Sequence, residues 1–202
     1  MIAILDYGMG NLRSVQKAFE KVGVEAAITA DPDEALEATA LVLPGVGGFS
    51  DAMAHLKSTG LHEVIIESIN KGRMFLGICL GLQLLFERSF EDGEHLGLGV
   101  FEGTVERLPE GVKIPHMGWN QIEKTRDLPL LGGIDDGTNF YFVHSYVVRP
   151  KNLEIVATVT DYGKEFVSGV SRDNVFAFQF HPEKSGSVGL SILKNFGDLC
   201  QQ

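Results

Sequence analysis

The stretch Met74-Phe75-Leu76-Gly77-Ile78-Cys79-Leu80-Gly81 runs from an apolar segment into a cysteine between two glycines. Residues 74–78 are typical of a buried strand, and residues 82–86 have helical spacing. A strand that ends in Gly-x-Cys-x-Gly and opens a helix is the thiol form of a nucleophile elbow. The turn lifts the sulfur above the sheet edge, and the helix directs N–H groups towards it. The pattern predicts that Cys79 is a catalytic nucleophile and that the Leu80 N–H faces an oxyanion.

A buried, inert thiol is the alternative for Cys79, because free cysteines are usually core residues. The second cysteine, Cys200, lies near the C-terminus without comparable surroundings, and we expect no catalytic role for it.

Strand and helix signals alternate on both sides of the elbow. A helix is expected after Asn11, which can cap it, and a shorter one after Asp31-Pro32. Expected strands in the first half cover residues 2–5, 24–28, 40–43 (stopped by Pro44) and 74–78. Strands of the second half cover residues 100–108, 119–124, 139–148, 155–160, 166–171 and 175–180, before a helix over 187–200. The sequence predicts one α/β domain, residues 1–202, with a mainly parallel central sheet flanked by helices and extended by antiparallel strands.

Composition narrows the class of protein. The chain has 202 residues, of which 44% are hydrophobic, enough for one domain with a full core. Its formal net charge of -10 makes nucleic acid an unfavourable partner. No signal peptide or membrane-spanning run is recognisable, so a cytoplasmic protein with reduced thiols is expected. We expect no metal site, since His55 and His62 lack helical metal spacing with a further ligand.

A catalytic thiol needs a general base, and six histidines are available. Three of them lie in polar stretches typical of the surface: His55, His62 and His95. His116 and His144 fall in strand-like segments, as does His181. The strand 175–180 ends at His181-Pro182-Glu183, where Glu183 can orient the imidazole and stabilise its charged form. Without Cys79, an ordinary strand-end histidine beside a solvated glutamate would be the better interpretation.

Several segments in this order resemble the class I glutamine amidotransferases. Gly77-Ile78-Cys79-Leu80-Gly81-Leu82-Gln83 is followed far downstream by His181-Pro182-Glu183, and Pro44-Gly45-Val46-Gly47 is similar to the oxyanion strand of that family. Further segments are similar to the family of glutaminase subunits of imidazole glycerol phosphate synthase: Gly8-Met9-Gly10-Asn11, Pro115-His116-Met117-Gly118-Trp119-Asn120, Tyr141-Phe142-Val143-His144-Ser145-Tyr146 and His181-Pro182-Glu183-Lys184-Ser185. The resemblance covers essentially the whole chain.

The resemblance implies a glutaminase that needs no cofactor and works through a Cys79–His181–Glu183 triad and a glutamyl thioester. It implies an oxyanion hole from the N–H of Leu80 with one from Val46 or Gly47. Substrate contacts implied by it are Gly47, Gln83, Ser145 and Tyr146. It also implies a heterodimer with a barrel-shaped cyclase, and an interface that includes Asn11, Trp119 and Lys184. The oxyanion site would be incomplete until this partner binds. The ammonia would then serve synthesis of imidazole glycerol phosphate and AICAR in histidine biosynthesis.

Some alternatives stay open at this level. Gly8-Met9-Gly10 hints at a dinucleotide loop, but Arg13 stands where the third glycine would fall. Trp119 is either a core residue or an interface anchor, and Gln83 is either a substrate contact or an exposed helix residue. The chain could also be the glutaminase subunit of another synthase, such as anthranilate synthase, a cysteine peptidase or esterase, or a non-catalytic regulatory subunit.

Overall fold

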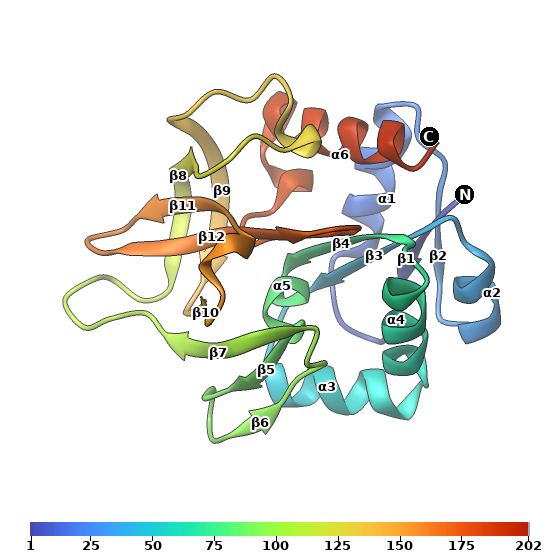
Figure 1. Cartoon of the computed structure of the whole chain (residues 1–202), viewed down its shortest axis with the longest axis horizontal. Helices are drawn as coiled ribbons and strands as arrows, with labels where there is room; N and C mark the ends of the chain where they lie inside the picture. Colours follow the sequence, from blue (N-terminus) through green and yellow to red (C-terminus); the bar gives the residue numbers. More distant parts are fainter. Residues whose placement is uncertain (202) are drawn as a thin grey trace.

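Five parallel strands form the part of the sheet that carries the elbow. In the computed structural model, which describes residues 1–201, they lie in the order β2-β1-β3-β4-β13. The first four of these strands are labelled in Figure 1. Their bounds are Ile2–Leu5 (β1), Ala26–Thr29 (β2), Ala40–Gly45 (β3), Met74–Cys79 (β4) and Val175–Phe178 (β13). Consecutive residues of these strands are buried almost throughout, as expected of parallel strands covered on both faces.

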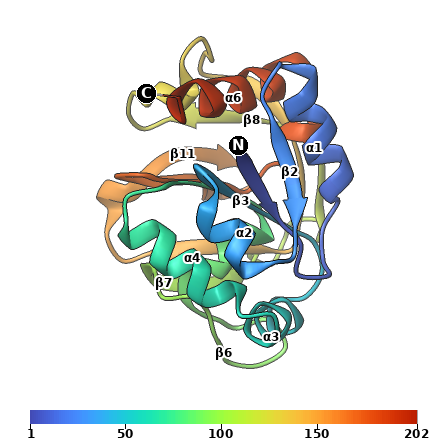
Figure 2. The same ribbon diagram turned by 90° about the vertical axis from the view of Figure 1, so that its right-hand side faces the viewer.

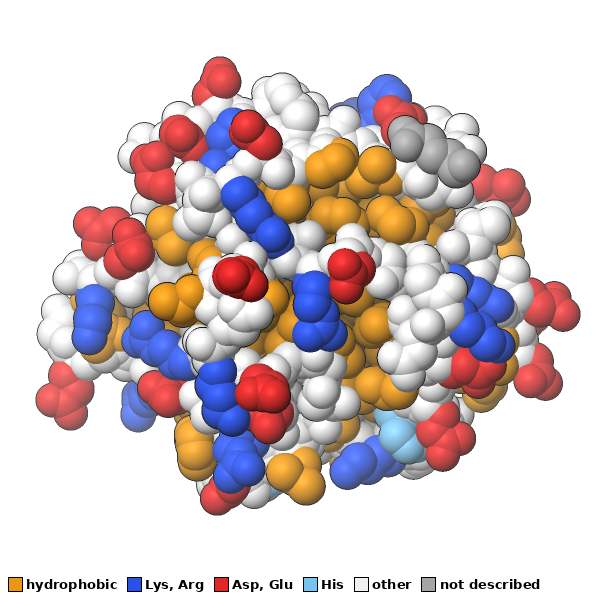
Figure 3. Space-filling view, in the orientation of Figure 1, with side chains coloured by type: hydrophobic (Ala, Val, Ile, Leu, Met, Phe, Trp, Pro, Cys, Tyr) orange, Lys and Arg blue, Asp and Glu red, His pale blue; other side chains and the backbone are white. Residues whose placement is uncertain are grey.

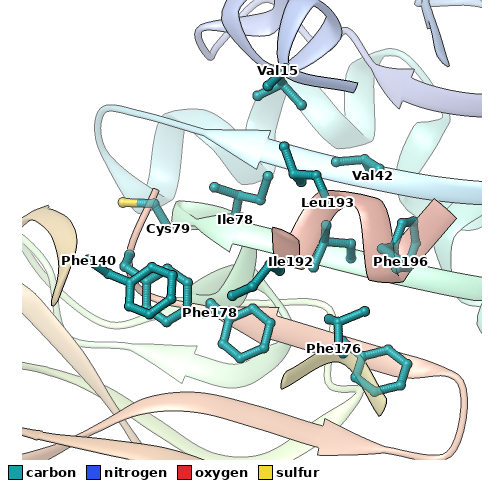
Figure 4. Close-up of a cluster of buried hydrophobic side chains, with 14 of the residues drawn as sticks. Val15, Val42, Ile78, Cys79, Phe140, Phe176, Phe178, Ile192, Leu193 and Phe196 are labelled. Carbon is teal, nitrogen blue, oxygen red and sulfur yellow. The ribbon is translucent and has the colours of Figure 1, made fainter. Parts of the chain in front are cut away.

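Helices cover both faces of these strands, and the alternation of side chains decides which face each residue joins. Ile2 and Ile4 of β1 belong to one apolar cluster, together with residues of α1 (Leu12–Lys21) and α6 (Gly186–Leu199). Ala3 and Leu5 belong to a second cluster, with residues of α2 (Pro32–Glu37), α3 (Phe49–Ser58) and α4 (Leu61–Asn70). Figure 2 shows the two helical layers on opposite sides, and Figure 4 shows part of the first cluster.

Beyond β13 the sheet is mostly antiparallel, and it continues as β12-β10-β7-β5-β6, with β11, β8 and β9 branching from β12. The strands are β5 (Phe86–Ser89), β6 (His95–Leu96), β7 (Phe101–Arg107), β8 (His116–Lys124), β9 (Thr138–His144), β10 (Tyr146–Pro150), β11 (Val156–Asp161) and β12 (Glu165–Arg172). Four short helices complete the described residues 1–201: α5 (Leu80–Leu84), η1 (Pro129–Leu131), η2 (Leu153–Ile155) and η3 (Pro182–Lys184). This is the predicted fold class, a large mixed sheet flanked by helices.

The expected end of β3 at Pro44 is wrong, because the strand runs through Gly45. The β1–β3 ladder ends at Val42, whereas the β3–β4 ladder continues to Gly45 opposite Cys79. The Pro44 carbonyl accepts a hydrogen bond from the Tyr7 hydroxyl at 3.0 Å, on the side away from β4. The missing N–H of Pro44 falls on that same side, where no ladder partner is needed.

Other expected boundaries also changed. The helix after Cys79 ends at Leu84, and Phe86 begins a strand instead of continuing it. The expected strand 139–148 is divided at Ser145 into β9 and β10, and the last strand ends at Phe178. Asn11 does occupy the N-cap position of α1, but its side chain makes no capping hydrogen bond. Asp31 caps α2 as expected, since its carboxylate accepts from the N–H groups of residues 33 and 34.

The surface in Figure 3 carries basic and acidic side chains interspersed, with apolar groups between them. None of the helices within residues 1–201 is long and apolar enough to cross a membrane.

Candidate active site

The predicted strand–cysteine–helix turn is present at Cys79, the last residue of β4. Its φ of 54° and ψ of -106° lie where a residue with a side chain is strained. The flanking glycines explain how the turn closes. A Cβ on Gly81 would collide with the Leu43 carbonyl oxygen, and one on Gly77 would come within 2.9 Å of the Ala177 side chain. Figure 4 shows the Cys79 sulfur directed away from the apolar side chains of the core.

His181 reaches the cysteine because β13 lies parallel to β4, with Phe178 opposite Ile78. The His181 Nδ1 lies 2.8 Å from Oε1 of Glu183, and the two side chains are only 3% and 2% exposed. The His181 backbone N–H donates to the Tyr141 carbonyl at 2.9 Å, and its carbonyl accepts from the Ser185 hydroxyl at 2.6 Å. The structure therefore places the His181–Glu183 pair beside the strand that ends at Cys79, with the His181 backbone held at its N–H and at its carbonyl and the imidazole held at Nδ1.

The electrostatics of His181 suit an acid–base catalyst. Burial disfavours the imidazolium and lowers the pKa, but the Cys79 thiolate charge and the hydrogen-bonded Glu183 carboxylate outweigh burial. Together they raise the pKa of His181 to about 10. The imidazole Nε2 and the outer oxygen of Glu183, Oε2, are buried and have no hydrogen-bond partner among the described residues. Nε2 is thus available to exchange a proton with a reacting group.

Two groups outside the triad contact the sulfur. The Val143 carbonyl lies 3.7 Å from Sγ of Cys79 and can accept its S–H, and the amide Nε2 of Gln179 donates to Sγ at 3.6 Å. Neither residue was expected from the sequence. Gln179 follows β13 two residues before His181, so strand alternation is a signal that could have placed both on the same side.

A cavity of about 270 Å³ opens beside the sulfur. Its lining includes all the residues predicted for the oxyanion hole and the substrate, together with the predicted nucleophile: Val46, Gly47, Cys79, Leu80, Gln83, Ser145 and Tyr146. Four further residues complete it, namely Glu91, Pro115, Val143 and His144. The segments that the sequence analysis selected separately therefore converge on one site large enough for an amino acid.

Gln83 is buried, so its interpretation as an exposed helix residue is wrong. Its Nε2 donates to the Tyr146 carbonyl at 3.1 Å and to Oε1 of Gln179 at 3.2 Å.

Glu91 is the charged residue of the cavity that sequence reasoning missed. Its Oε2 accepts a hydrogen bond from the Phe49 N–H at 2.8 Å. Burial raises the pKa of Glu91, although the Phe49 hydrogen bond opposes the shift. It lies eight residues beyond Gln83 and follows β5, of which only the first residue, Phe86, was covered by an expectation, so no local pattern marked it.

The two other strand histidines are not alternative bases. Nδ1 of His116 lies 2.9 Å from Nε2 of His144, and Nδ1 of His144 lies 3.0 Å from the Tyr146 carbonyl oxygen. Burial lowers the pKa of His116 to about 4 and that of His144 to about 3, where the neighbouring histidines add to the effect. Both rings are therefore neutral at physiological pH and already hydrogen-bonded.

The three residues expected at a partner interface lie outside the cavity. Trp119 is 57% exposed, so the core interpretation is wrong, and its ring meets Tyr141 edge-on at 6.1 Å between centroids. Nζ of Lys184 lies 6.0 Å from the centre of the same Tyr141 ring. Asn11 is exposed at the start of α1, which packs against η3, the element that carries Lys184. Trp119 and Lys184 thus share one surface around Tyr141, next to His181.

Comparison with known proteins gives a consistent result. A family model described as glutamine amidotransferase class-I matches residues 3–199. Proteins named imidazole glycerol phosphate synthase subunit HisH are similar along almost the whole chain. The one from Syntrophotalea carbinolica is 56% identical and covers 98% of this chain and 100% of its own length. The one from Aquifex aeolicus is 57% identical and covers 96% and 94%.

Solved structures agree on the fold. A structure described as a glutamine amidotransferase has a TM-score of 0.78 at 21% identity and covers 100% of this chain and 99% of its own. PurLQS from Thermotoga maritima has a TM-score of 0.77 at 19% identity and covers 98% and 97%.

Proposed function

The chain belongs to the class I glutamine amidotransferase family, and from this premise we propose that it is the glutaminase subunit of an imidazole glycerol phosphate synthase. The observation that carries the proposal is the buried His181–Glu183 pair beside the strained Cys79, at the end of a cavity of amino-acid size. Identity of 56% to a HisH subunit over nearly the full length supports this synthase over others that use the same triad.

Hydrolysis proceeds in two halves. The Cys79 thiolate attacks the side-chain carbonyl carbon of glutamine, and a C–S bond forms while the oxygen takes the negative charge. The imidazolium of His181 gives its proton to the nitrogen, the C–N bond breaks, and ammonia leaves a glutamyl thioester. His181, now neutral, takes a proton from water, which attacks the thioester. The C–S bond breaks, glutamate is released, and the sulfur returns as a thiolate paired with the imidazolium.

The oxyanion is held by the N–H of Leu80 and by one N–H from the 46–47 segment. Leu80 is the first residue of α5 and directly follows the nucleophile. Val46 and Gly47 lie across the cavity, beyond the end of β3, and both are exposed. One such donor is worth roughly 2.7–4 kcal/mol of barrier. Glycine at 47, with a φ of 99°, lets the peptide change orientation at low steric cost, so this donor can depend on a partner.

Glutamine is recognised by charge as well as shape. The Glu91 carboxylate is positioned to pair with the substrate's α-ammonium group, since it lines the cavity that also contains Cys79. Gln83 and the backbone of Ser145 and Tyr146 supply neutral hydrogen-bonding groups for the rest of the amino acid.

A partner is needed because ammonia released into water at neutral pH is mostly protonated and no longer nucleophilic. The surface around Tyr141, with Trp119, Met117 and Lys184, is where we place the cyclase subunit. Met117 and Trp119 are 62% and 57% exposed and, two residues apart on β8, lie on the same face of the strand, so they present two neighbouring large apolar side chains that a protein partner can cover. Asn11 extends this face along α1. In the heterodimer the ammonia is used for imidazole glycerol phosphate and AICAR in histidine biosynthesis, in the cytoplasm, where the Cys79 thiol stays reduced.

The test measures glutamate formation by the chain alone and with its candidate cyclase. We expect a low basal rate and a large increase when the cyclase and its acceptor substrate are present. No glutamate in either mixture would contradict the glutaminase assignment, and equal rates would contradict partner control of the oxyanion segment. Trp119→Ala should weaken stimulation and leave the basal rate unchanged, whereas Leu153→Ala, at a similarly exposed apolar residue elsewhere, should change neither the stimulation nor the basal rate.

A further inference from the structure

Gln179 is a completely buried amide beside the reactive sulfur, and the triad mechanism gives it no role. Its Nε2 lies 3.6 Å from Sγ of Cys79, and its Oε1 accepts from Nε2 of Gln83 at 3.2 Å. Because both the oxygen and the nitrogen of this buried amide make contacts, the side chain is held in one orientation. The group that fixes this orientation decides whether the amide nitrogen or the amide oxygen faces the sulfur.

The Tyr146 carbonyl oxygen sets the orientation, because a carbonyl can only accept. Gln83 must turn its nitrogen towards this oxygen, which lies 3.1 Å away. The same nitrogen carries the second N–H that reaches Gln179, so Gln179 must present its oxygen to Gln83 and its nitrogen to the sulfur. The reversed amide would oppose two N–H groups and would place an oxygen against Sγ.

A second donor fixes the carbonyl itself. Nδ1 of His144 donates to the Tyr146 oxygen at 3.0 Å, which leaves Nε2 of His144 as the acceptor for Nδ1–H of His116. Both lone pairs of the carbonyl are then used, and it cannot rotate without breaking two partly buried hydrogen bonds.

We propose that Gln179 is a fourth catalytic residue, whose side-chain N–H donates to the Cys79 sulfur and favours its thiolate. The amide transfers no proton. It stabilises the charge on the sulfur before attack and again when the thioester C–S bond breaks and its electron pair returns to sulfur. The Val143 carbonyl, 3.7 Å from Sγ, has the opposite preference, because it can accept an S–H but repels a thiolate. The sulfur thus lies between one group that favours the thiol and one that favours the anion.

The test follows alkylation of Cys79 by iodoacetamide as a function of pH in the full chain, with Cys79 and Cys200 separated by mass spectrometry. Because alkylation requires no glutamine, it reports on the sulfur whether or not the proposed glutaminase function holds. For Gln179→Leu we expect the midpoint of the pH profile to rise by about one pH unit, as for the loss of one hydrogen bond to a charged group. Gln179→Glu keeps an acceptor for Gln83 but places a carboxylate at the sulfur, so its midpoint should rise further.

Gln83→Glu gives an independent measurement at a residue that does not touch the sulfur. It removes the donor that orients Gln179, and its profile should shift in the same direction. Gln121→Leu, on an exposed glutamine, is the matched control and should leave the profile unchanged. Near-UV circular dichroism identifies which variants keep the native fold. If folded Gln179 or Gln83 variants alkylate with the wild-type pH profile, the proposal is wrong.

Discussion

The two sides of the active-site cavity are built in opposite ways. On one side, Cys79, His181 and Gln179 are buried at the ends of two paired parallel strands, and each is held by several contacts. On the other side, Val46 and Gly47 lie beyond the last ladder pair of β3, exposed to solvent. The proposed nucleophile is thus preorganised, whereas the segment proposed to hold the oxyanion is left adjustable. The partner control that we propose can act on the second side without disturbing the first.

The strongest test of the fixed side removes the nucleophile. Cys79→Ala should lower glutamine hydrolysis roughly 10⁴-fold or more, because the remaining triad residues cannot form the thioester. The loss should be the same with and without the cyclase. In the assembled synthase, added ammonium salts should restore product formation. Glutamine-dependent product formation at the wild-type level by this variant would show that Cys79 is not the nucleophile.

Each side of the cavity contains a glycine whose substitution tests how rigid that side is. Gly81→Ala should destabilise the protein by about 1–3 kcal/mol or more, since the new Cβ collides with the backbone carbonyl of Leu43, and hydrolysis should fall with and without the partner. Gly47→Ala should cost about 1–2 kcal/mol for its positive φ, because the nearest group is the flexible end of Met9.

Denaturant unfolding measures both glycine effects, and glutamate assays with and without the cyclase separate the two sides. We expect Gly47→Ala to reduce the stimulated rate more than the basal rate. An equal loss in both rates would mean that the 46–47 segment is as fixed as the elbow.

Glu91→Gln should change substrate binding without altering either the buried or the exposed side of the cavity. Losing one charge-assisted contact to the α-ammonium should raise KM roughly tenfold or more, with a smaller change in kcat. The hydrolysis kinetics of glutamine and of an analogue without the α-amino group provide the measurement. The variant and the wild type should treat the analogue alike. If the variant loses activity equally on both compounds, Glu91 does not recognise the ammonium group.

The smallest effect is spectroscopic and concerns the charge state of His181. Its pKa, about 10 when folded, exceeds the ordinary value of about 6.5. The protonated ring therefore contributes stability that is complete below about pH 6.5 and is lost as pH rises through about 10. Cys79→Ala removes the thiolate charge but keeps the burial, so the pKa of His181 should fall. An NMR titration of the histidine ring protons measures this, and an unchanged pKa in the variant would contradict the thiolate–imidazolium pairing.

Most of the features that the sequence predicted are made of residues that are adjacent in the chain. The elbow was recognisable because its glycines, apolar strand and following helix are adjacent in the chain, and the same holds for His181-Pro182-Glu183. The boundaries that failed depend on neighbours. Pro44 stays within β3 because β1 no longer pairs there, and Phe86 leaves the helix to pair with β7. Neither condition is visible in a window of sequence.

The missed site residues are also non-local. Glu91 reaches the cavity from a loop after β5, and Val143 reaches the sulfur from β9. The position of Gln179 could have been predicted, because strand alternation places its side chain on the same side as that of His181. The sequence of an apolar strand does not indicate, however, which partner orients the amide. That partner, Gln83, is 96 residues away in the chain.

The pairing of β4 with β13 has a consequence for how the enzyme is made. The sulfur and its amide partner Gln179 are separated by 100 residues, so the site closes only when almost the whole chain is in place. During synthesis, Cys79 leaves the ribosome long before His181 and Glu183 exist. A nascent or truncated chain therefore carries a thiol with no base. If the proposed triad is the catalyst, glutamine is therefore not consumed until nearly the whole chain has folded.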